Sequence, residues 1–178
     1  NQTKLYIGME TKIIYKNYAY EIKQNDFSDY PDDYSDDMFL IYDHRDFNVK
    51  RDGFKPSDIA ENPKDYDDFY IYPVFAYIHS GVSLSLAHNG DKWDTSMRGY
   101  LLANKSEFNE ESARETALNL IERWNMYLSG EVYDVVIYKL KKCPTCSHIE
   151  YEEIDSDWEI YGFEEAERTA KEMIDNYA

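Results

Sequence analysis

Residues 70–103 read YIYPVFAYIHSGVSLSLAHNGDKWDTSMRGYLLA, and this stretch decides the fold. Apolar residues alternate with other residues over 74–78 and again over 82–87, which is the period of strands half-buried in a sheet. A turn at 79–81 separates these two strands, and a loop after residue 87 leads into a third strand over 98–103. The sequence therefore predicts three strands whose two connecting loops carry most of the reactive side chains.

Two amphipathic helices are predicted outside this stretch. One is capped by Asn109 and ends at Gly130, and the other runs over 163–177. Their predicted core faces are Ala113, Ala117, Leu120, Ile121, Trp124 and Leu128 in the first helix, and Phe163, Ala166, Ala170, Met173, Ile174 and Tyr177 in the second.

Further strands are predicted from short apolar runs at 38–42, 132–140 and 149–154, with a ribbon of short strands over 3–22. The predicted class is α+β, with an antiparallel β-sheet, two helices packed on one face and an N-terminal β-hairpin. The predicted division is an N-terminal β-ribbon over 1–25 and a single α+β domain over 26–178.

The charge of the chain restricts its partners. The 36 acidic and 19 basic residues give a net charge of −17, which excludes a broad basic surface and direct binding to duplex DNA. The 18 tyrosines add aromatic surface suited to interfaces, so one interpretation is a surface that docks on a basic partner. The alternative is a soluble acidic protein whose charge only prevents aggregation. No apolar run is long enough to span a membrane and no signal peptide opens the chain, so we expect no membrane partner and a cytoplasmic location.

Two acidic segments are candidates for docking. Residues 26–37 hold six aspartates, and residues 150–159 hold six carboxylates interrupted by Ile154 and Trp158, which are expected in the core. Each segment is interpreted either as solvated surface or as a strip that binds a basic partner. The predicted binding residues are Tyr30, Asp32, Asp33, Tyr34, Asp36, Trp93, Asp155 and Trp158.

Polar residues at strand ends form a candidate catalytic set, His44, Arg45, His79 and Asp94. Two histidines could transfer protons while a guanidinium holds a phosphodiester, and Asp94 could orient a histidine or bind a divalent metal ion. The alternative is a hydrogen-bonded network that holds the loops in place.

A C-x-x-C motif, Cys143 to Cys146, is followed by His148. It resembles one zinc knuckle, but a closed zinc site needs four ligands and the chain has no second knuckle. Reduced thiols in a hairpin turn are the preferred interpretation, and neither a metal nor another cofactor is assigned.

Four segments together resemble a widespread family of small phage and mobile-element proteins. They are HRDFN at 44–48, IHSGVSLSLAHNGDKWDTSMRGYLLA at 78–103, YLSGEVYDVVIY at 127–138 and EIDSDWEIYG at 153–162. This chain departs from the family pattern in three places: Ile78 replaces an aspartate, Asp157 replaces a cysteine, and Glu159 and Ile160 replace glycine and phenylalanine. Some members of the family are similar to type II-A anti-CRISPR proteins.

The resemblance implies an anti-defence protein acting in the cytoplasm of a bacterial host. Its expected partner is a type II CRISPR effector nuclease, alone or with its guide RNA, whose basic nucleic-acid channels suit an acidic surface. One alternative is a ribonuclease that truncates the guide RNA through His44, Arg45, His79 and Asp94. The other is an antirestriction protein that mimics DNA.

Overall fold

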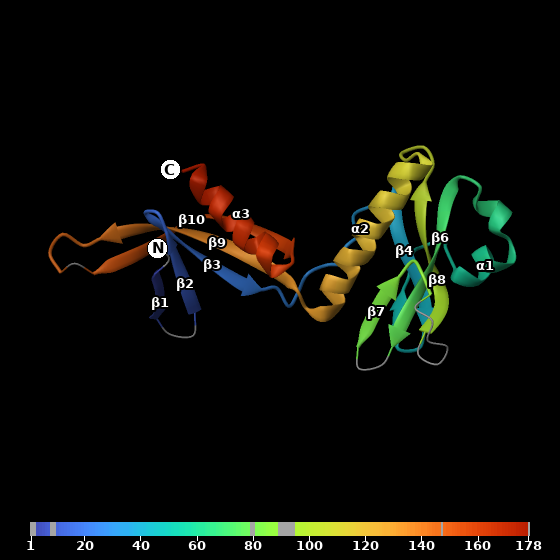
Figure 1. Cartoon of the computed structure of the whole chain (residues 1–178), viewed down its shortest axis with the longest axis horizontal. Coiled ribbons are helices and arrows are strands. Elements are labelled where there is room, and N and C mark those ends of the chain that lie inside the picture. Colours follow the sequence, from blue (N-terminus) through green and yellow to red (C-terminus); the bar gives the residue numbers. More distant parts are fainter. Residues whose placement is uncertain (1–2, 8–9, 79–80, 89–94, 147, 178) are drawn as a thin grey trace. The chain divides into compact units, whose positions relative to one another are not determined.

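The computed structural model describes residues 3–7, 10–78, 81–88, 95–146 and 148–177. This part of the chain divides into two compact units, residues 1–28 with 130–178, and residues 29–129 (Figure 1). Each unit contains one five-stranded antiparallel sheet and one long helix. The α+β class, the antiparallel pairing and the N-terminal hairpin predicted from the sequence are therefore confirmed.

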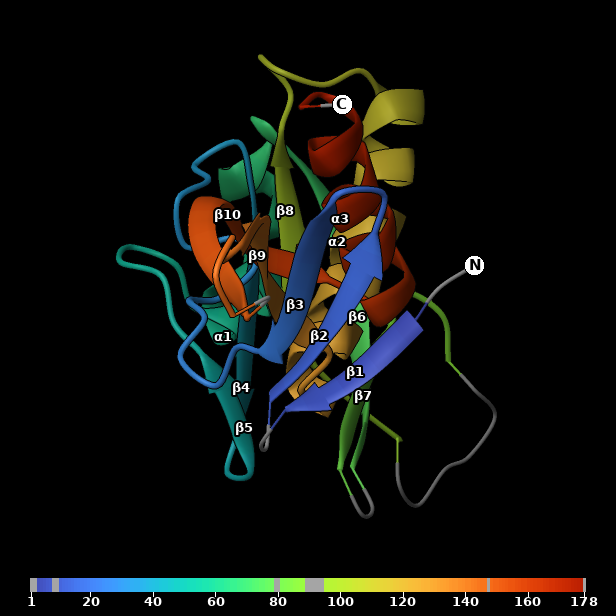
Figure 2. The same cartoon turned by 90° about the vertical axis from the view of Figure 1, so that its left-hand side faces the viewer.

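The first unit is built on a sheet in the order β1-β2-β3-β9-β10. Its strands are β1 (Thr3–Ile7), β2 (Glu10–Tyr15), β3 (Tyr18–Gln24), β9 (Val132–Lys142) and β10 (Ile149–Tyr161). Strands β1 and β2 form the N-terminal hairpin, and β2 continues into β3 beside it (Figure 2). Helix α3 (Phe163–Asp175) packs on β9, β10 and β3.

The core of the first unit lies between α3 and one face of this sheet. It consists of Tyr20, Val135, Ile137, Ile160, Ala166, Ala170 and Ile174. The two ends of the predicted helical face differ from expectation, because Phe163 and Tyr177 are about half exposed. Both lie at the helix boundaries, and Tyr177 instead directs its hydroxyl to a carboxylate oxygen of Asp155 at 2.9 Å.

The second unit contains a sheet in the order β5-β4-β8-β6-β7. Its strands are β4 (Met38–His44), β5 (Phe47–Val49), β6 (Phe69–Ile78), β7 (Val82–Ser85) and β8 (Thr95–Asn104). Helix α2 (Glu110–Ser129) covers one face, while α1 (Pro56–Glu61) and the 3₁₀ turn η1 (Pro63–Tyr66) follow β5. The predicted strands at 38–42, 74–78, 82–87 and 98–103 are all present with shifted ends.

Both faces of the second sheet are covered, which explains the continuous apolar run in β4. Met38, Leu40 and Tyr42 point to the core beneath α2, whereas Phe39 and Ile41 join a core with Ile59 of α1. The α2 core face is the one expected, with Ala113, Ala117, Leu120, Ile121 and Trp124 buried and Leu128 partly buried against them.

The pairing of β3 with β9 changes the division of the chain expected from the sequence. Tyr18↔Lys139 through Gln24↔Tyr133 form a ladder between segments more than 100 residues apart. The ribbon over 1–25 is therefore part of a unit with residues 130–178, and the predicted single sheet is two sheets, each with its own helix. Local patterns predict strands, but the choice of partner depends on cores formed only in the folded chain.

Candidate functional site

His44 and Arg45 lie in the turn between β4 and β5, where their polar groups contact Asp46. The His44 ring nitrogen Nδ1 accepts a hydrogen bond from the Asp46 N–H at 3.2 Å. Arg45 Nε donates to Asp46 Oδ2 at 2.9 Å, and this bond raises the pKa of the already exposed guanidinium. The two side chains are thus engaged in a local turn network, which is the alternative to catalysis considered above.

The strands that flank the predicted catalytic residues end at the same end of the second sheet. The register Tyr42↔Gly99 and Tyr77↔Thr95 places the end of β4, the end of β6 and the start of β8 at the same end of the second sheet. His79, Trp93 and Asp94 lie outside the described residues. The ends of these strands therefore lie together, while the catalytic set itself stays a prediction.

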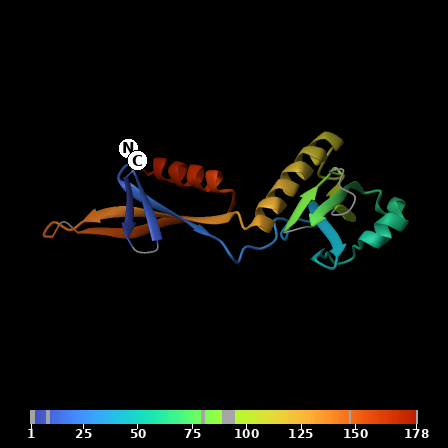
Figure 3. The same ribbon diagram turned by 60° about the horizontal axis from the view of Figure 1, so that its bottom comes forward.

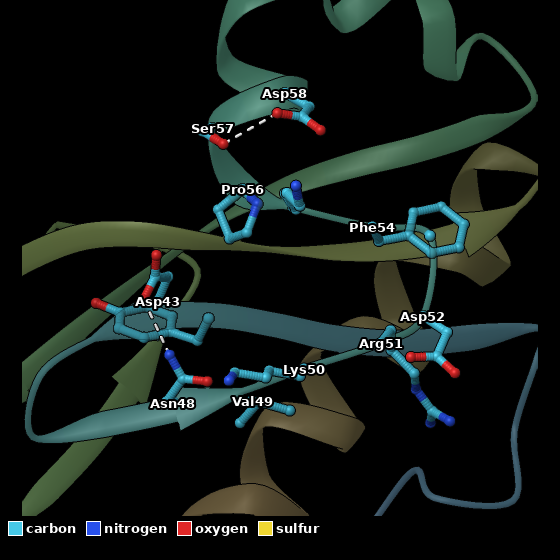
Figure 4. Close-up of a pocket in the computed structure, with 13 residues that line it drawn as sticks. Asp43, Asn48, Val49, Lys50, Arg51, Asp52, Phe54, Pro56, Ser57 and Asp58 are labelled. Carbon is cyan, nitrogen blue, oxygen red and sulfur yellow. Dashed lines mark hydrogen bonds between the residues drawn. The ribbon is translucent and has the colours of Figure 1, made fainter.

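A polar pocket of about 740 Å³ lies beside the turn between β4 and β5 (Figure 4). Asp43 and Asn48 line it and are joined by a hydrogen bond from Asn48 Nδ2 to Asp43 Oδ1 at 2.9 Å. The remaining lining includes three cations and two carboxylates, contributed by Lys50, Arg51, Lys55, Asp52 and Asp58. The sequence analysis did not predict this pocket, although three basic residues within six positions of an acidic chain were a signal for it.

The chemistry of this pocket suits binding of a small polar or anionic group. Its one hydroxyl on an aliphatic side chain, Ser57 Oγ, donates to the neighbouring Asp58 carboxylate at 3.0 Å. Both residues are exposed.

Asp32 corrects the interpretation of residues 26–37 as an exposed loop. This side chain is only 3% exposed, and Asp32 Oδ2 accepts the buried N–H of Leu40 at 2.5 Å. Arg51 donates to the main-chain carbonyls of Asp32 and Asp33, tying the loop to the segment after β5. Burial raises the pKa of the Asp32 carboxyl, so this residue is a structural group and not a docking charge.

The Tyr30 side chain packs partly against other aromatic residues of the second unit. Its ring lies against Trp124, with ring centres 5.2 Å apart, and edge-on to Tyr127 at 5.6 Å. The Tyr30 N–H donates to Asp33 Oδ2 at 3.2 Å, whereas Tyr34 is 87% exposed. Of the predicted binding residues in this loop, Tyr30, Asp33, Tyr34 and Asp36 remain exposed, and only Asp32 is buried.

Trp158 lies on edge strand β10 and is 60% exposed, which corrects its expected place in the core. The register of β10 against β9 shifts between Asp157 and Ile160, and Glu159 has a positive φ of 58°. This bulge places the Trp158 side chain outside the hydrophobic core, while Ile160 returns to it. Ile154, expected in the core as well, is partly buried against it.

Asp134 stabilises the bulge from the neighbouring strand. Its Oδ1 atom accepts the Glu159 N–H at 3.1 Å and the Asn25 side-chain amide at 2.8 Å. The Trp158 N–H donates to Asp157 Oδ1 at 2.9 Å. A positive φ at a non-glycine residue costs free energy, so these hydrogen bonds hold a conformation that the local sequence does not favour.

Carboxylates surround this tryptophan along β10 and α3. Residues 149–175 contain eleven acidic side chains and two basic ones. Both bases pair within α3, Arg168 with Glu165 and Glu172, and Lys171 with Glu167. Asp155 is half-buried and accepts the Tyr177 hydroxyl. Glu152 pairs with Lys141 of β9 at 2.8 Å. We call the exposed residues of this edge strand, on both of its faces, the β10 acidic surface: Glu150, Glu152, Glu153, Asp157 and Trp158.

The C-x-x-C motif forms the turn between β9 and β10, as expected. The main-chain N–H of Cys143 donates to the His148 carbonyl at 2.8 Å, and both cysteines are free thiols. The backbone N–H groups of Cys146 and Thr145 hydrogen-bond to the Cys143 sulfur and lower the pKa of that thiol. Within the described residues, no three His, Cys, Asp or Glu side chains group as a metal site.

The chain matches no family model, no curated protein and no solved structure. Among the described residues, no helix combines the length and the apolar character needed to cross a membrane. Function is therefore inferred from the surfaces described above and from the resemblance of the four sequence segments.

Proposed function

We propose that this protein is an anti-defence inhibitor that binds a type II CRISPR effector nuclease through the β10 acidic surface. The observation that carries the proposal is Trp158, an exposed indole on a bulged edge strand among carboxylates. The resemblance of the four sequence segments to phage and mobile-element proteins supports the choice of partner. The proposed place of action is the cytoplasm of a bacterial host.

The physical basis is complementarity to a channel that normally holds nucleic acid. Such a channel is lined by lysine and arginine, which attract carboxylates over long range and can stack on an indole. Tryptophan is among the residues most often found as interface hot spots, whereas scattered surface charges mainly speed association. Trp158 is therefore assigned most of the affinity and the surrounding carboxylates most of the association rate.

The test is binding of the purified protein to a type II effector, with and without guide RNA, by surface plasmon resonance at several salt concentrations. Trp158→Ala removes a side chain that lies outside the core, so the fold should be kept. A hot spot contributes about 2 kcal/mol or more, which corresponds to roughly 30-fold weaker binding. Failure of the unaltered protein to bind in both states, or equal affinity of Trp158→Ala, would refute the proposal.

A charge variant tests the second part of the assignment. Glu150→Gln, Glu153→Gln and Asp157→Asn together remove three exposed charges, and the association rate and its salt dependence should both fall. The matched control is Glu61→Gln, Glu115→Gln and Glu122→Gln, which makes the same charge change on the second unit. Equal effects of the two variants would show that net charge alone drives association.

A ribonuclease that truncates guide RNA is the alternative from another class, and it is supported by the position of His44, since the end of β4 lies at the same end of the second sheet as the end of β6 and the start of β8. Guide RNA incubated with the protein and effector distinguishes the two, since an inhibitor leaves it intact. Shortening that is abolished by His44→Ala, with effector binding retained, would favour the enzyme. Relief of plasmid restriction without relief of guided cleavage would instead indicate a DNA-mimic antirestriction protein.

A further inference from the structure

The β9–β10 hairpin extends beyond the rest of its sheet. The β3–β9 ladder ends at Tyr18↔Lys139, whereas the β9–β10 ladder continues to Ile149↔Lys142 and then reaches the cysteine turn (Figures 1 and 3). The four residue steps from Lys139 to Cys143 correspond to about 13 Å of extended chain. Among the described residues of the first unit, β10 alone pairs with β9 over this length, and the two thiols lie at its tip.

The tip is a turn that carries both thiols. Cys143 and Cys146 are separated only by Pro144 and Thr145, and both are free cysteines. Pro144 favours such a turn, which is closed by the hydrogen bond from the Cys143 N–H to the His148 carbonyl at 2.8 Å. Two cysteines at C-x-x-C spacing in a turn are half of the ligand set of a structural zinc site.

The ligand count then decides what the tip can bind. Structural zinc is held by four ligands in a tetrahedron, and one tip supplies two thiols. His148 does not group with the two cysteines in the described structure, where no three-residue ligand cluster is found. Two identical tips related by a twofold axis would supply four cysteines. We propose that Cys143 and Cys146 from two copies of this chain bind one zinc ion and join the copies tip to tip.

Electrostatics permit this contact although each chain carries a net charge of −17. Two tips of about 13 Å each separate the main parts of the sheets by roughly 26 Å, and exposed charges are largely screened beyond about 8 Å at physiological ionic strength. Within the tip, Glu150 and Glu152 lie across the hairpin from Lys141 and Lys139, and Lys141 pairs with Glu152 at 2.8 Å. A zinc ion with four thiolates carries a net charge of −2, and the exposed Lys142 beside each turn is placed to offset part of it.

The test uses the full chain without an affinity tag, under reducing conditions, with zinc or with a chelator. Light scattering coupled to gel filtration should show twice the monomer mass with zinc and the monomer mass after chelation. Metal analysis should find one zinc ion per two chains, and cobalt substitution should give the intense thiolate bands of a tetrahedral tetrathiolate site. Cys143→Ser and Cys146→Ser should each abolish zinc-dependent dimers while leaving the circular dichroism spectrum unchanged.

His148→Ala is the matched control, and it should dimerise with zinc as the unaltered chain does. Loss of zinc binding in this variant, or one zinc ion per monomer, would show a site completed within one chain and overturn the proposal. Absence of zinc binding, or zinc-dependent dimers that persist in both serine variants, would also overturn it. None of these results depends on effector binding, so the zinc proposal and the proposed function can fail separately.

Discussion

Substitution of Asp32 separates the two properties of its carboxylate, which are hydrogen-bond acceptance and negative charge. Leu40 is fully buried in β4, and its N–H donates to Asp32 Oδ2. Asp32→Ala leaves this N–H without an acceptor in a place that water does not reach. A buried unsatisfied donor costs about 1–3 kcal/mol, so we expect Asp32→Ala to lower the free energy of unfolding by that amount.

Asp32→Asn should behave differently because an amide oxygen can still accept from Leu40. The substitution also removes a buried negative charge, whose desolvation cost Arg51 only partly offsets in the unaltered protein. We therefore expect the free energy of unfolding of Asp32→Asn at neutral pH to lie within about 1 kcal/mol of the unaltered protein.

The dependence on pH gives a sharper distinction. Burial raises the pKa of Asp32 above its ordinary value of 3.8, so the folded state holds this proton more tightly than the unfolded state. Its stabilising contribution is complete below pH 3.8 and is lost as the pH rises through the folded-state pKa. Compared with the unaltered protein, Asp32→Asn should therefore gain stability as the pH rises across this window.

Urea unfolding followed by tryptophan fluorescence measures these differences, since the buried Trp124 lies in the same unit. Asp33→Asn is the control, because Asp33 is exposed and an amide oxygen can still accept the Tyr30 N–H. The reasoning is refuted if Asp32→Asn loses as much stability as Asp32→Ala, or if Asp32→Ala is indistinguishable from Asp33→Asn.

Two further substitutions test the packing of the two units. Gly99→Ala would place a Cβ against the Tyr42 ring and the Ile41 carbonyl, so it should lower the free energy of unfolding in urea by about 1–3 kcal/mol. The control is Gly81→Ala, which should change stability little because no atom lies within 4 Å of its Cβ. Burial and the nearby Glu167 raise the pKa of Tyr20 to about 12, so the absorbance titration should contain a late tyrosinate step that Tyr20→Phe removes. Between pH 10 and about 12 the folded state keeps the Tyr20 hydroxyl proton and the unfolded state loses it, so the free energy of unfolding should fall over that range. A free energy of unfolding that stays constant there would contradict the raised pKa of Tyr20.

The sequence alone was sufficient for most of the secondary structure. Alternation over 74–78 and 82–87 produced β6 and β7, and the apolar face from Ala113 to Trp124 produced α2. These predictions succeed because side-chain periodicity and helix caps act within a few residues of each other. The continuous apolar run over 38–42 likewise predicted a strand, and the structure shows that both faces of this strand, β4, are buried.

Strand partners and the fate of single polar or aromatic residues were decided by the tertiary structure. Ile22 pairs with Val135 across more than 100 residues, and no local pattern encodes that choice. Asp32 is buried because Leu40 and Arg51 meet it in space, and Trp158 is exposed because Asp134 of the neighbouring strand stabilises a bulge beside it. Residue type alone predicts an exposed aspartate and a buried tryptophan. The opposite is found because the hydrogen bonds that decide it join segments that come together only when the chain folds.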